Sequence, residues 1–227
     1  MSILLAVFDI AGTTVADDNA VAAAFQKAFE QHGISITEDE VKPLMGYKKT
    51  EAIRVMLNRH KRDDSTEKVN AIHESFVNEM NDYYEYSPAV RPMPDAESVF
   101  LQLKEKGIRI ALNTGFPRVI ADTIVSRLQW KERGLIDDYI ASDEVAAGRP
   151  GPFMIRELMR RAQVTDAAQV VKIGDTEVDV AEGRQAGCSL VVAVTTGAFT
   201  REQLEPYKPD EIVDNLSAIP YLIFSRA

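Results

Sequence analysis

The alternation of helical and strand segments in the last two thirds of the chain constrains the fold more than any other feature. Residues 96–106 have a helical pattern that stops at Gly107, and residues 108–113 then form an apolar strand. The alternation continues with helices over 118–128, 152–162 and 178–186 and strands over 139–141, 170–173 and 190–194. Such alternation builds a parallel sheet with helices on both faces. We therefore expect an α/β fold with a Rossmann-like parallel sheet.

The amino-terminal part adds one strand and then changes character. Residues 3–8 are uniformly apolar, as in a strand buried on both faces, and Asp9 follows them. Residues 17–87 show helical periodicity throughout and contain no convincing strand. We therefore predict a catalytic core made of residues 1–16 and 88–227, with an α-helical cap domain over residues 17–87 inserted between the first strand and the rest.

Composition narrows the classes of protein. The 227 residues carry a formal net charge of −9, which disfavours a nucleic-acid partner, because nucleic acids bind positively charged surfaces. The single cysteine, Cys188, cannot form an internal disulfide, and no apolar run approaches the roughly 20 residues that span a bilayer. We expect a cytoplasmic protein without a membrane or nucleic-acid partner.

Asp9 is the leading candidate for a nucleophile. It leaves a buried strand and enters a turn containing Gly12 and Thr13. A carboxylate in this place lies at the carboxyl edge of the sheet, where open α/β folds build their active sites. A carboxylate that only closes the strand end is the alternative.

Polar residues also follow two later strands. The Thr114 hydroxyl and the N–H groups around Gly115 are suited to phosphoryl oxygens, although a plain turn is the alternative. Asp175 and Asp179 begin a helix near Asp9, where carboxylates would repel one another unless a hard cation such as Mg²⁺ lay between them. Helix capping is the alternative for these two residues.

The run from Asp9 to Thr14, Asp-Ile-Ala-Gly-Thr-Thr, resembles the first motif of the haloacid dehalogenase superfamily. Ala11 stands where most members have a second Asp that protonates the leaving group, and this form is found in the phosphonatase (phosphonoacetaldehyde hydrolase) branch. The resemblance implies that Asp9 attacks phosphorus. It also implies that Mg²⁺ is held by Asp9, the Ala11 carbonyl and Asp175, with Asp179 in support.

Two further segments resemble the same branch. In Gly148-Arg149-Pro150, the resemblance implies that Arg149 binds the phosphonate oxygens together with Thr114. Met45-Gly46-Tyr47-Lys48-Lys49 is similar to the cap segment whose lysine forms a Schiff base with the substrate aldehyde. The spacing favours Lys49, with Lys48 as the alternative nucleophile. The iminium collects the electrons of the broken C–P bond, so no acid is needed at Ala11.

The reactive lysine must be neutral to attack a carbonyl. Because its ordinary pKa is about 10.4, desolvation or a second cation must lower it, and Lys48 is the expected cation. The chain departs from the branch at two places. Ala52 stands where the family has a His suited to proton transfer, and Phe116 stands where it has a Tyr.

The sequence therefore predicts a Mg²⁺-dependent hydrolase that cleaves the C–P bond of phosphonoacetaldehyde or a related small phosphonate. Asp9 and Lys49 are the predicted catalytic residues. The predicted substrate-binding residues are Met45, Gly46, Thr114, Gly115, Phe116 and Arg149. The alternatives are a phosphomonoester phosphatase of the same superfamily, acting on a small metabolite, and a catalytically silent phosphate-binding dimer. The resemblance also implies a homodimer formed through the cap.

Overall fold

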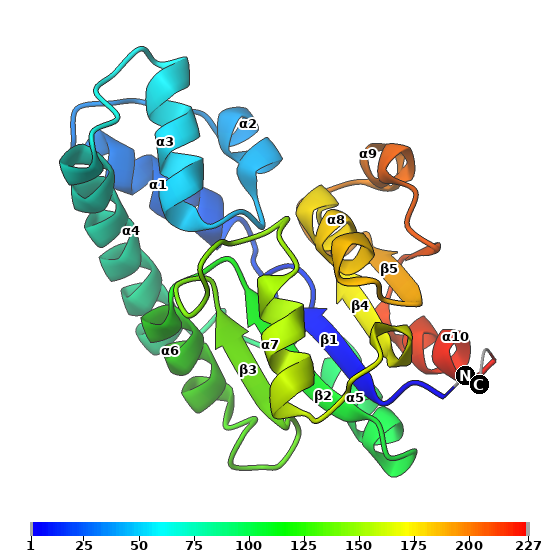
Figure 1. The fold of residues 1–227 in the computed structure, drawn as a ribbon. Coiled ribbons are helices and arrows are strands. Elements are labelled where there is room, and N and C mark those ends of the chain that lie inside the picture. Colours follow the sequence, from blue (N-terminus) through cyan, green and yellow to red (C-terminus); the bar gives the residue numbers. More distant parts are fainter. Residues whose placement is uncertain (1, 226–227) are drawn as a thin grey trace.

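Residues 2–225 are described by the computed structural model, and their six strands form one parallel sheet (Figure 1). The strands are β1 (Leu5–Asp9), β2 (Arg109–Thr114), β3 (Asp138–Ala141), β4 (Val170–Gly174), β5 (Leu190–Val194) and β6 (Glu211–Val213). Their order across the sheet is β3-β2-β1-β4-β5-β6, and every neighbouring pair is parallel. The predicted α/β fold with a Rossmann-like sheet is confirmed.

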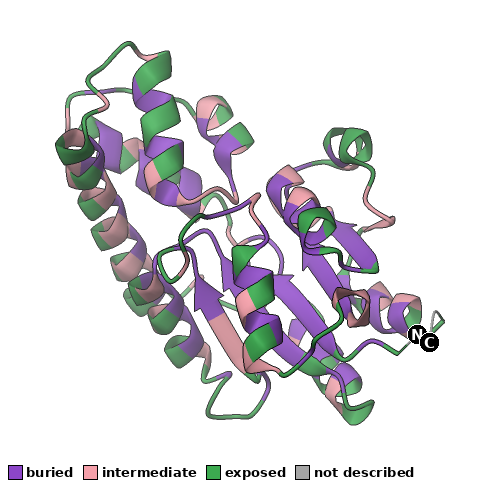
Figure 2. Ribbon diagram, in the orientation of Figure 1, coloured by how far each residue is buried: buried purple, intermediate pink, exposed green. Residues whose placement is uncertain are grey.

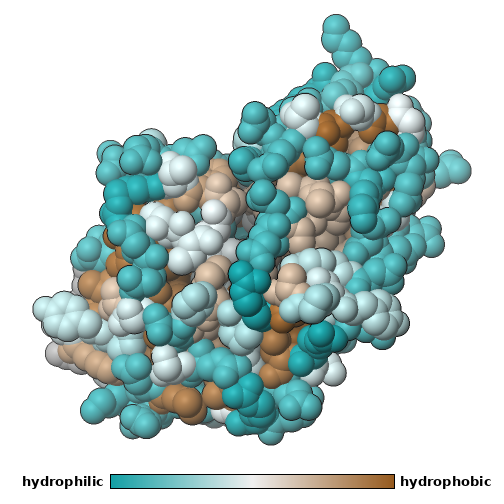
Figure 3. Space-filling view, turned by 180° about the vertical axis from the view of Figure 1, so that it is seen from behind, coloured by the Kyte–Doolittle hydropathy of each residue, from teal (hydrophilic) through white to brown (hydrophobic). Residues whose placement is uncertain are grey.

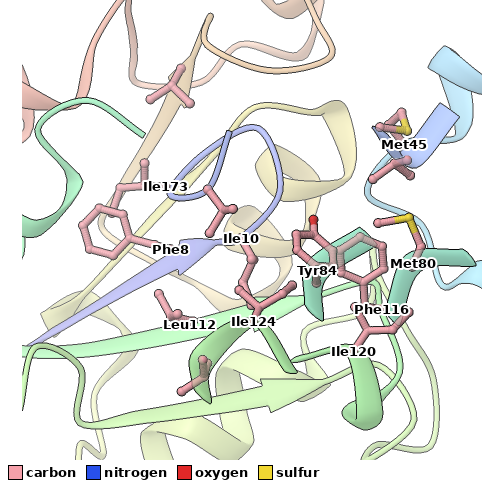
Figure 4. Packing of buried hydrophobic residues seen from close by; sticks show 14 of the residues in the cluster. Phe8, Ile10, Met45, Met80, Tyr84, Leu112, Phe116, Ile120, Ile124 and Ile173 are labelled. Atoms are coloured by element: carbon pink, nitrogen blue, oxygen red, sulfur yellow. The ribbon is translucent and has the colours of Figure 1, made fainter. Parts of the chain in front are cut away.

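Helices cover both faces of this sheet and bury its strands (Figures 1 and 2). The core helices are α5 (Ala96–Glu105), α6 (Arg118–Leu128), α7 (Phe153–Arg161), α8 (Glu177–Ala186), α9 (Arg201–Leu204) and α10 (Ile219–Phe224). Side chains alternate along β1, so Leu5 and Val7 pack with α7 and α8, while Ala6 and Phe8 pack with α5 and α6. Figure 4 shows the second group around Phe8, Leu112 and Ile124. This packing explains why the strand is apolar on both faces.

Four helices gather beyond the carboxyl end of the sheet (Figure 1). They are α1 (Ala20–Glu30), α2 (Glu38–Val41), α3 (Lys49–Arg59) and α4 (Thr66–Tyr86), with the short 3-10 turn η1 (Lys42–Leu44) between α2 and α3. Helix α4 begins where the Ser65 side chain accepts a hydrogen bond from the Lys68 N–H, and it packs along α6 of the core. We refer to α1–α4 as the cap. The exact division into two domains stays a prediction.

The segment after β5 contains structure that the sequence pattern did not predict. Strand β6 has only three half-buried residues, which is too short to show a periodic pattern, and it pairs with β5. Met1 and residues 226–227, which the predicted core includes, lie outside the described residues. Within residues 2–225, every helix is too short or too polar to cross a membrane.

Candidate active site

Strand β1 brings Asp9 to the carboxyl edge of the sheet, next to Asn113 of β2. The turn after it folds back tightly, because the Thr14 hydroxyl donates to the Asp9 carbonyl oxygen at 2.8 Å and Gly12 has a φ of +85°. A Cβ atom at Gly12 would lie 2.7 Å from Oδ2 of Asp175. Only glycine therefore allows this turn to approach Asp175 so closely.

Three buried carboxylates meet at this edge. Oxygen atoms of Asp9, Asp175 and Asp179 all lie within 4.8 Å of one another. Asp175 accepts hydrogen bonds from the Thr13 hydroxyl at 3.0 Å and the Ala198 N–H at 2.7 Å. Burial, together with the charges of Asp9 and Asp179, raises the pKa of Asp175 well above its usual value. A divalent cation bound by these oxygens would offset that repulsion.

Asp179 differs from the other two carboxylates because protein groups already surround it. Its Oδ2 accepts hydrogen bonds from the N–H and hydroxyl of Thr176, which caps α8. Its Oδ1 forms ion pairs with Lys172 at 2.8 Å and Arg149 at 3.1 Å. Burial opposes the charge of Asp179, yet Arg149 and Lys172 hold its pKa below the usual value. Both oxygens are thus engaged before any ligand binds.

Arg149 is fully enclosed by acceptors of the protein. Nη1 lies 2.5 Å from Asp9 and 3.1 Å from Asp179, and Nε lies 3.0 Å from Glu182. Nη2 donates to both the carbonyl oxygen and Oδ1 of Asn113, each at 2.7 Å. The guanidinium thus donates four hydrogen bonds to protein acceptors, and its contact with Asp179 is an ion pair. A contact between Arg149 and a substrate oxygen would therefore compete with these contacts.

Lys172 and Glu182 complete a buried network below Asp9. Lys172 lies in the middle of β4 and donates to Asn113 Oδ1 at 2.8 Å, while Glu182 on α8 accepts from the Asn113 amide at 2.8 and 2.9 Å. Both side chains are completely buried. With Asp9, Asp175, Asp179 and Glu182 ionised, Arg149 and Lys172 leave two negative charges unbalanced. Those are the charges that a divalent cation such as Mg²⁺ would neutralise, and carboxylate oxygens are ligands it prefers.

Lys49, the first residue of α3, enters the site from the cap. Its Nζ lies 5.0 Å from the ring centre of Phe116 and 5.7 Å from that of Phe25. Burial in these apolar surroundings lowers the pKa of Lys49 to about 8, with Arg149 acting in the same direction and Asp9 opposing it. At pH 7 about a tenth of the Lys49 amine is therefore neutral, far more than for an ordinary lysine.

Lys48 lies elsewhere. It is half-buried, and a Cβ atom at Gly148 would lie 2.7 Å from its Cβ, so Lys48 packs against the loop that precedes Arg149. The expected role of Lys48 as the cation that lowers the pKa of Lys49 needs correction. The causes are burial and the Arg149 guanidinium, since the helix start turns the two neighbouring lysines in different directions.

The cap loop between η1 and α3 rests directly on the core. Gly46 has a φ of +83°, and a Cβ atom there would lie 2.5 Å from the Thr176 hydroxyl oxygen. The Tyr47 hydroxyl donates to Glu177 at 2.9 Å. The space enclosed beneath the loop is only about 20 Å³, enough for one water molecule. Its lining residues are Asp9, Ala11, Val21, Met45, Gly46, Lys49, Thr114, Gly115, Phe116, Asp175 and Thr176. A substrate therefore requires the cap to open.

A larger hollow of about 410 Å³ lies between cap and core, beside the enclosed space. Seen from behind, the molecular surface is hollowed between these two parts (Figure 3). Residues 16–19 of the connection into α1, Arg91 of the return connection and residues 196–198 after β5 line this hollow. Met45 lines both spaces and therefore lies where the enclosed site and the hollow adjoin.

Comparison with known proteins agrees with this arrangement. The family model described as haloacid dehalogenase-like hydrolase matches residues 6–193. The chain belongs to this family. This hydrolase is also 30% identical, over 214 residues, to phosphonoacetaldehyde hydrolase from Bordetella pertussis, covering 88% of this chain and 76% of that protein. The resemblance stated from the sequence motifs is confirmed.

Solved structures show the same fold with different names. A phosphonoacetaldehyde hydrolase-like protein from Oleispira antarctica has a TM-score of 0.88 at 22% identity, covering 99% of this chain and 92% of that chain. A predicted phosphoglycolate phosphatase from Haemophilus somnus has a TM-score of 0.79 at 18% identity, covering 98% of each chain. At these identities the likeness concerns the fold alone.

The structure brings the residues predicted for the site together around one enclosed space, with two exceptions. Arg149 and Asp179 lie behind Asp9, at the buried network, and do not line that space. The predicted roles of all these residues stay predictions. Sequence reasoning missed Lys172 and Glu182, although a lysine inside an otherwise apolar strand was the available signal.

Ala52 stands where a histidine was expected, and the three histidines of the chain lie elsewhere. His32 lies near Ser75 and Lys68 within the cap, and His60 pairs with Glu40 at 2.7 Å. His73, on α4, is half-buried. None of the three lines the enclosed space among the described residues.

Proposed function

We propose that this hydrolase cleaves the C–P bond of a small phosphonate that carries an aldehyde, such as phosphonoacetaldehyde. The observation that carries the proposal is the buried Lys49 amine, which faces the same small space as Asp9 and has a pKa lowered to about 8. A solvated lysine on a cap would remain charged at neutral pH. The curated relative from Bordetella pertussis bears the name of this activity.

The proposed reaction starts on the organic half of the substrate. Lys49 adds to the aldehyde carbon and water is lost, which leaves an iminium. Asp9 then attacks phosphorus, the C–P bond breaks, and its electron pair moves into the iminium to give an enamine on Lys49 and a phosphoryl group on Asp9. Protonation and hydrolysis of the enamine release acetaldehyde, and hydrolysis of the aspartyl phosphate releases phosphate. Ala11 is compatible with this route because no leaving group needs an acid.

The residues of the site fit a magnesium ion. Asp9, the Ala11 carbonyl and Asp175 would hold it. Asp179, which already contacts Thr176, Lys172 and Arg149, would lie behind these ligands and support the site. When bound, Mg²⁺ would neutralise charge on the carboxylates and on the phosphonate oxygens. Thr114 lines the space beside Asp9 and is the proposed phosphonate ligand. Arg149 orients Asp9 through their ion pair. A homodimer through the cap stays a prediction.

Borohydride trapping tests the proposal. Reduction during turnover of phosphonoacetaldehyde should leave an N-ethyl group on Lys49, located by peptide mass mapping, and should inactivate the enzyme. Lys48 should remain unmodified and serves as the internal control. Hydrolysis of p-nitrophenyl phosphate or sugar phosphates without any lysine adduct would favour the phosphatase alternative, and phosphate binding without turnover would favour the silent dimer.

The trapping rate should follow the protonation of Lys49. Because burial lowers the pKa to about 8, the neutral amine increases about tenfold per pH unit below that value and levels off above it. A bound divalent cation would move the plateau to still lower pH. An ordinary lysine would continue to gain reactivity up to about pH 10.4. A trapping rate constant that still rises steeply above about pH 9, as a solvated lysine would show, would contradict this assignment.

Gly115→Ala should disturb closure of the cap. The new Cβ atom would lie 2.5 Å from the Tyr47 carbonyl oxygen and 2.6 Å from that of Gly46, so the cap loop must retreat. A displacement of this size is expected to lower kcat/KM by about 10- to 100-fold, because Lys49 would no longer meet the substrate correctly. A melting temperature close to that of the wild-type protein would show that the loss of activity is not a folding defect. Unchanged kcat/KM would show that closure does not limit the reaction.

A further inference from the structure

Glu182, on α8, is a buried carboxylate that the proposed reaction does not use. It is completely buried and, among the described residues, lines neither the enclosed space beside Asp9 nor the hollow. A buried carboxylate is costly unless donors compensate its charge. Its two oxygens accept hydrogen bonds from the Asn113 amide at 2.9 and 2.8 Å, and Oε2 also accepts from Nε of Arg149 at 3.0 Å. Arg149 therefore connects this carboxylate with Asp9.

Asn113 connects Glu182 with the two cations of the buried network. Its Oδ1 accepts from Nη2 of Arg149 at 2.7 Å and from Nζ of Lys172 at 2.8 Å. Its amide nitrogen donates to Glu182. The two ends of a side-chain amide differ, since the oxygen only accepts and the nitrogen only donates. The cations on one side and the carboxylate on the other therefore fix a single orientation of the Asn113 side chain.

These contacts determine where the charge of Arg149 is directed. A guanidinium is planar and rigid, so contacts at two of its nitrogen atoms fix the position of the third. Glu182 engages Nε, and Asn113 engages Nη2 through its carbonyl oxygen and Oδ1, each at 2.7 Å. The remaining nitrogen, Nη1, lies 2.5 Å from Oδ1 of Asp9. Arg149 is thus held against one oxygen of the proposed nucleophile.

We propose that Glu182 and Asn113 are positioning residues for the attack on phosphorus. They hold Arg149 against Oδ1 of Asp9, so that the carboxylate keeps one orientation toward the substrate. This inference rests on the proposed function. A displacement of about 1 Å in such a group can cost about 100-fold in rate. Among the described residues, Lys49 takes no part in the hydrogen bonds and ion pairs of this network, so formation of the Schiff base does not depend on it.

The test uses the competition between borohydride reduction and C–P bond cleavage in Glu182→Gln, with Mg²⁺ at saturation. Glutamine has nearly the same shape, but its NH₂ group cannot accept the hydrogen bonds that a carboxylate oxygen accepts. Reduction before cleavage leaves a phosphonoethyl group on Lys49, and reduction after cleavage leaves an N-ethyl group. We expect the ratio of phosphonoethyl to N-ethyl adduct to rise about 10- to 100-fold, because only cleavage slows. A merely structural defect would lower both adducts together and leave their ratio unchanged.

Two further variants separate positioning from net charge. Glu182→Gln removes one negative charge, whereas the double variant that adds Lys172→Met removes one charge of each sign and preserves the net charge of the network. Exchange of a buried ion pair for neutral side chains of similar volume is often tolerated, so the double variant also guards against misfolding of the single one. It should show the raised adduct ratio as well. Glu157→Gln is the matched control, because Glu157 pairs with Arg160 at 2.7 Å on α7 and does not line the enclosed space; it should keep the wild-type ratio.

Two results would overturn the inference. A wild-type adduct ratio in Glu182→Gln would mean that Arg149 needs no anchor at Nε. A ratio that returns to the wild-type value in the double variant would mean that net charge alone sets the rate of cleavage. Absence of any Lys49 adduct in the wild-type enzyme would instead overturn the proposed function itself, so the two failures are distinguishable.

Discussion

Lys49→Met should abolish turnover of phosphonoacetaldehyde, with kcat/KM lowered by about 1,000-fold or more, as for removal of a covalent nucleophile. The protein should nevertheless become more stable. The fall in the pKa of Lys49 from 10.5 to about 8 corresponds to roughly 3 kcal/mol against the charged amine in the folded state. Methionine fits the apolar surroundings of Phe25 and Phe116 without carrying a charge.

The sign of this stability effect depends on pH. The folded-state pKa of Lys49 lies below the unfolded value, so the penalty is fully present below about pH 8 and fades as the pH rises toward the unfolded pKa. Denaturant unfolding at pH 7 and near pH 10 should therefore show a larger gain for Lys49→Met at the lower value. Lys48→Met is the control, because Lys48 packs against Gly148 and should leave turnover nearly unchanged. Loss of activity in both variants would argue against a unique role for Lys49.

Asp9→Asn should stop phosphate release, with a loss of about 10,000-fold or more, because the amide cannot attack phosphorus. Schiff-base formation on Lys49 does not require that attack. Borohydride should therefore trap the uncleaved substrate on Lys49 as a phosphonoethyl adduct, whereas the wild-type enzyme gives the N-ethyl product. Mass spectrometry of the modified peptide distinguishes the two.

The same variant changes the electrostatics of the site in a defined direction. Arg149 loses one partner but keeps Asp179 and Glu182, so the buried network should persist. The negative charge of Asp9 contributes to the raised pKa of Asp175, and its removal should lower that pKa. An N-ethyl adduct on Lys49 in Asp9→Asn would show that the C–P bond breaks without Asp9, and would exclude the aspartyl-phosphate route.

Local patterns along the chain were sufficient to predict most of the architecture. The apolar strands, separated by helices that end at Gly107 and Gly187, fix a parallel sheet, because alternating units can bury their strands only in that way. The carboxyl ends of parallel strands share one edge of the sheet. The sequence alone therefore predicts that Asp9, Thr114 and Asp175 lie close together. Strand β6 escaped prediction because three residues carry no period.

Contacts between distant residues decided what the sequence by itself left open. Lys48 and Lys49 are chemically alike, and only the packing at the start of α3 distinguishes them. Lys49 is buried near Phe116, whereas Lys48 is half-buried and packs against Gly148. The same holds for Arg149, which forms ion pairs with Asp9, Asp179 and Glu182 and hydrogen bonds with Asn113. The sequence by itself thus determined the sheet and the kinds of chemical group at its edge. Only the tertiary structure decided the burial and the partners of each group, because desolvation and charge pairing depend on residues far apart along the chain.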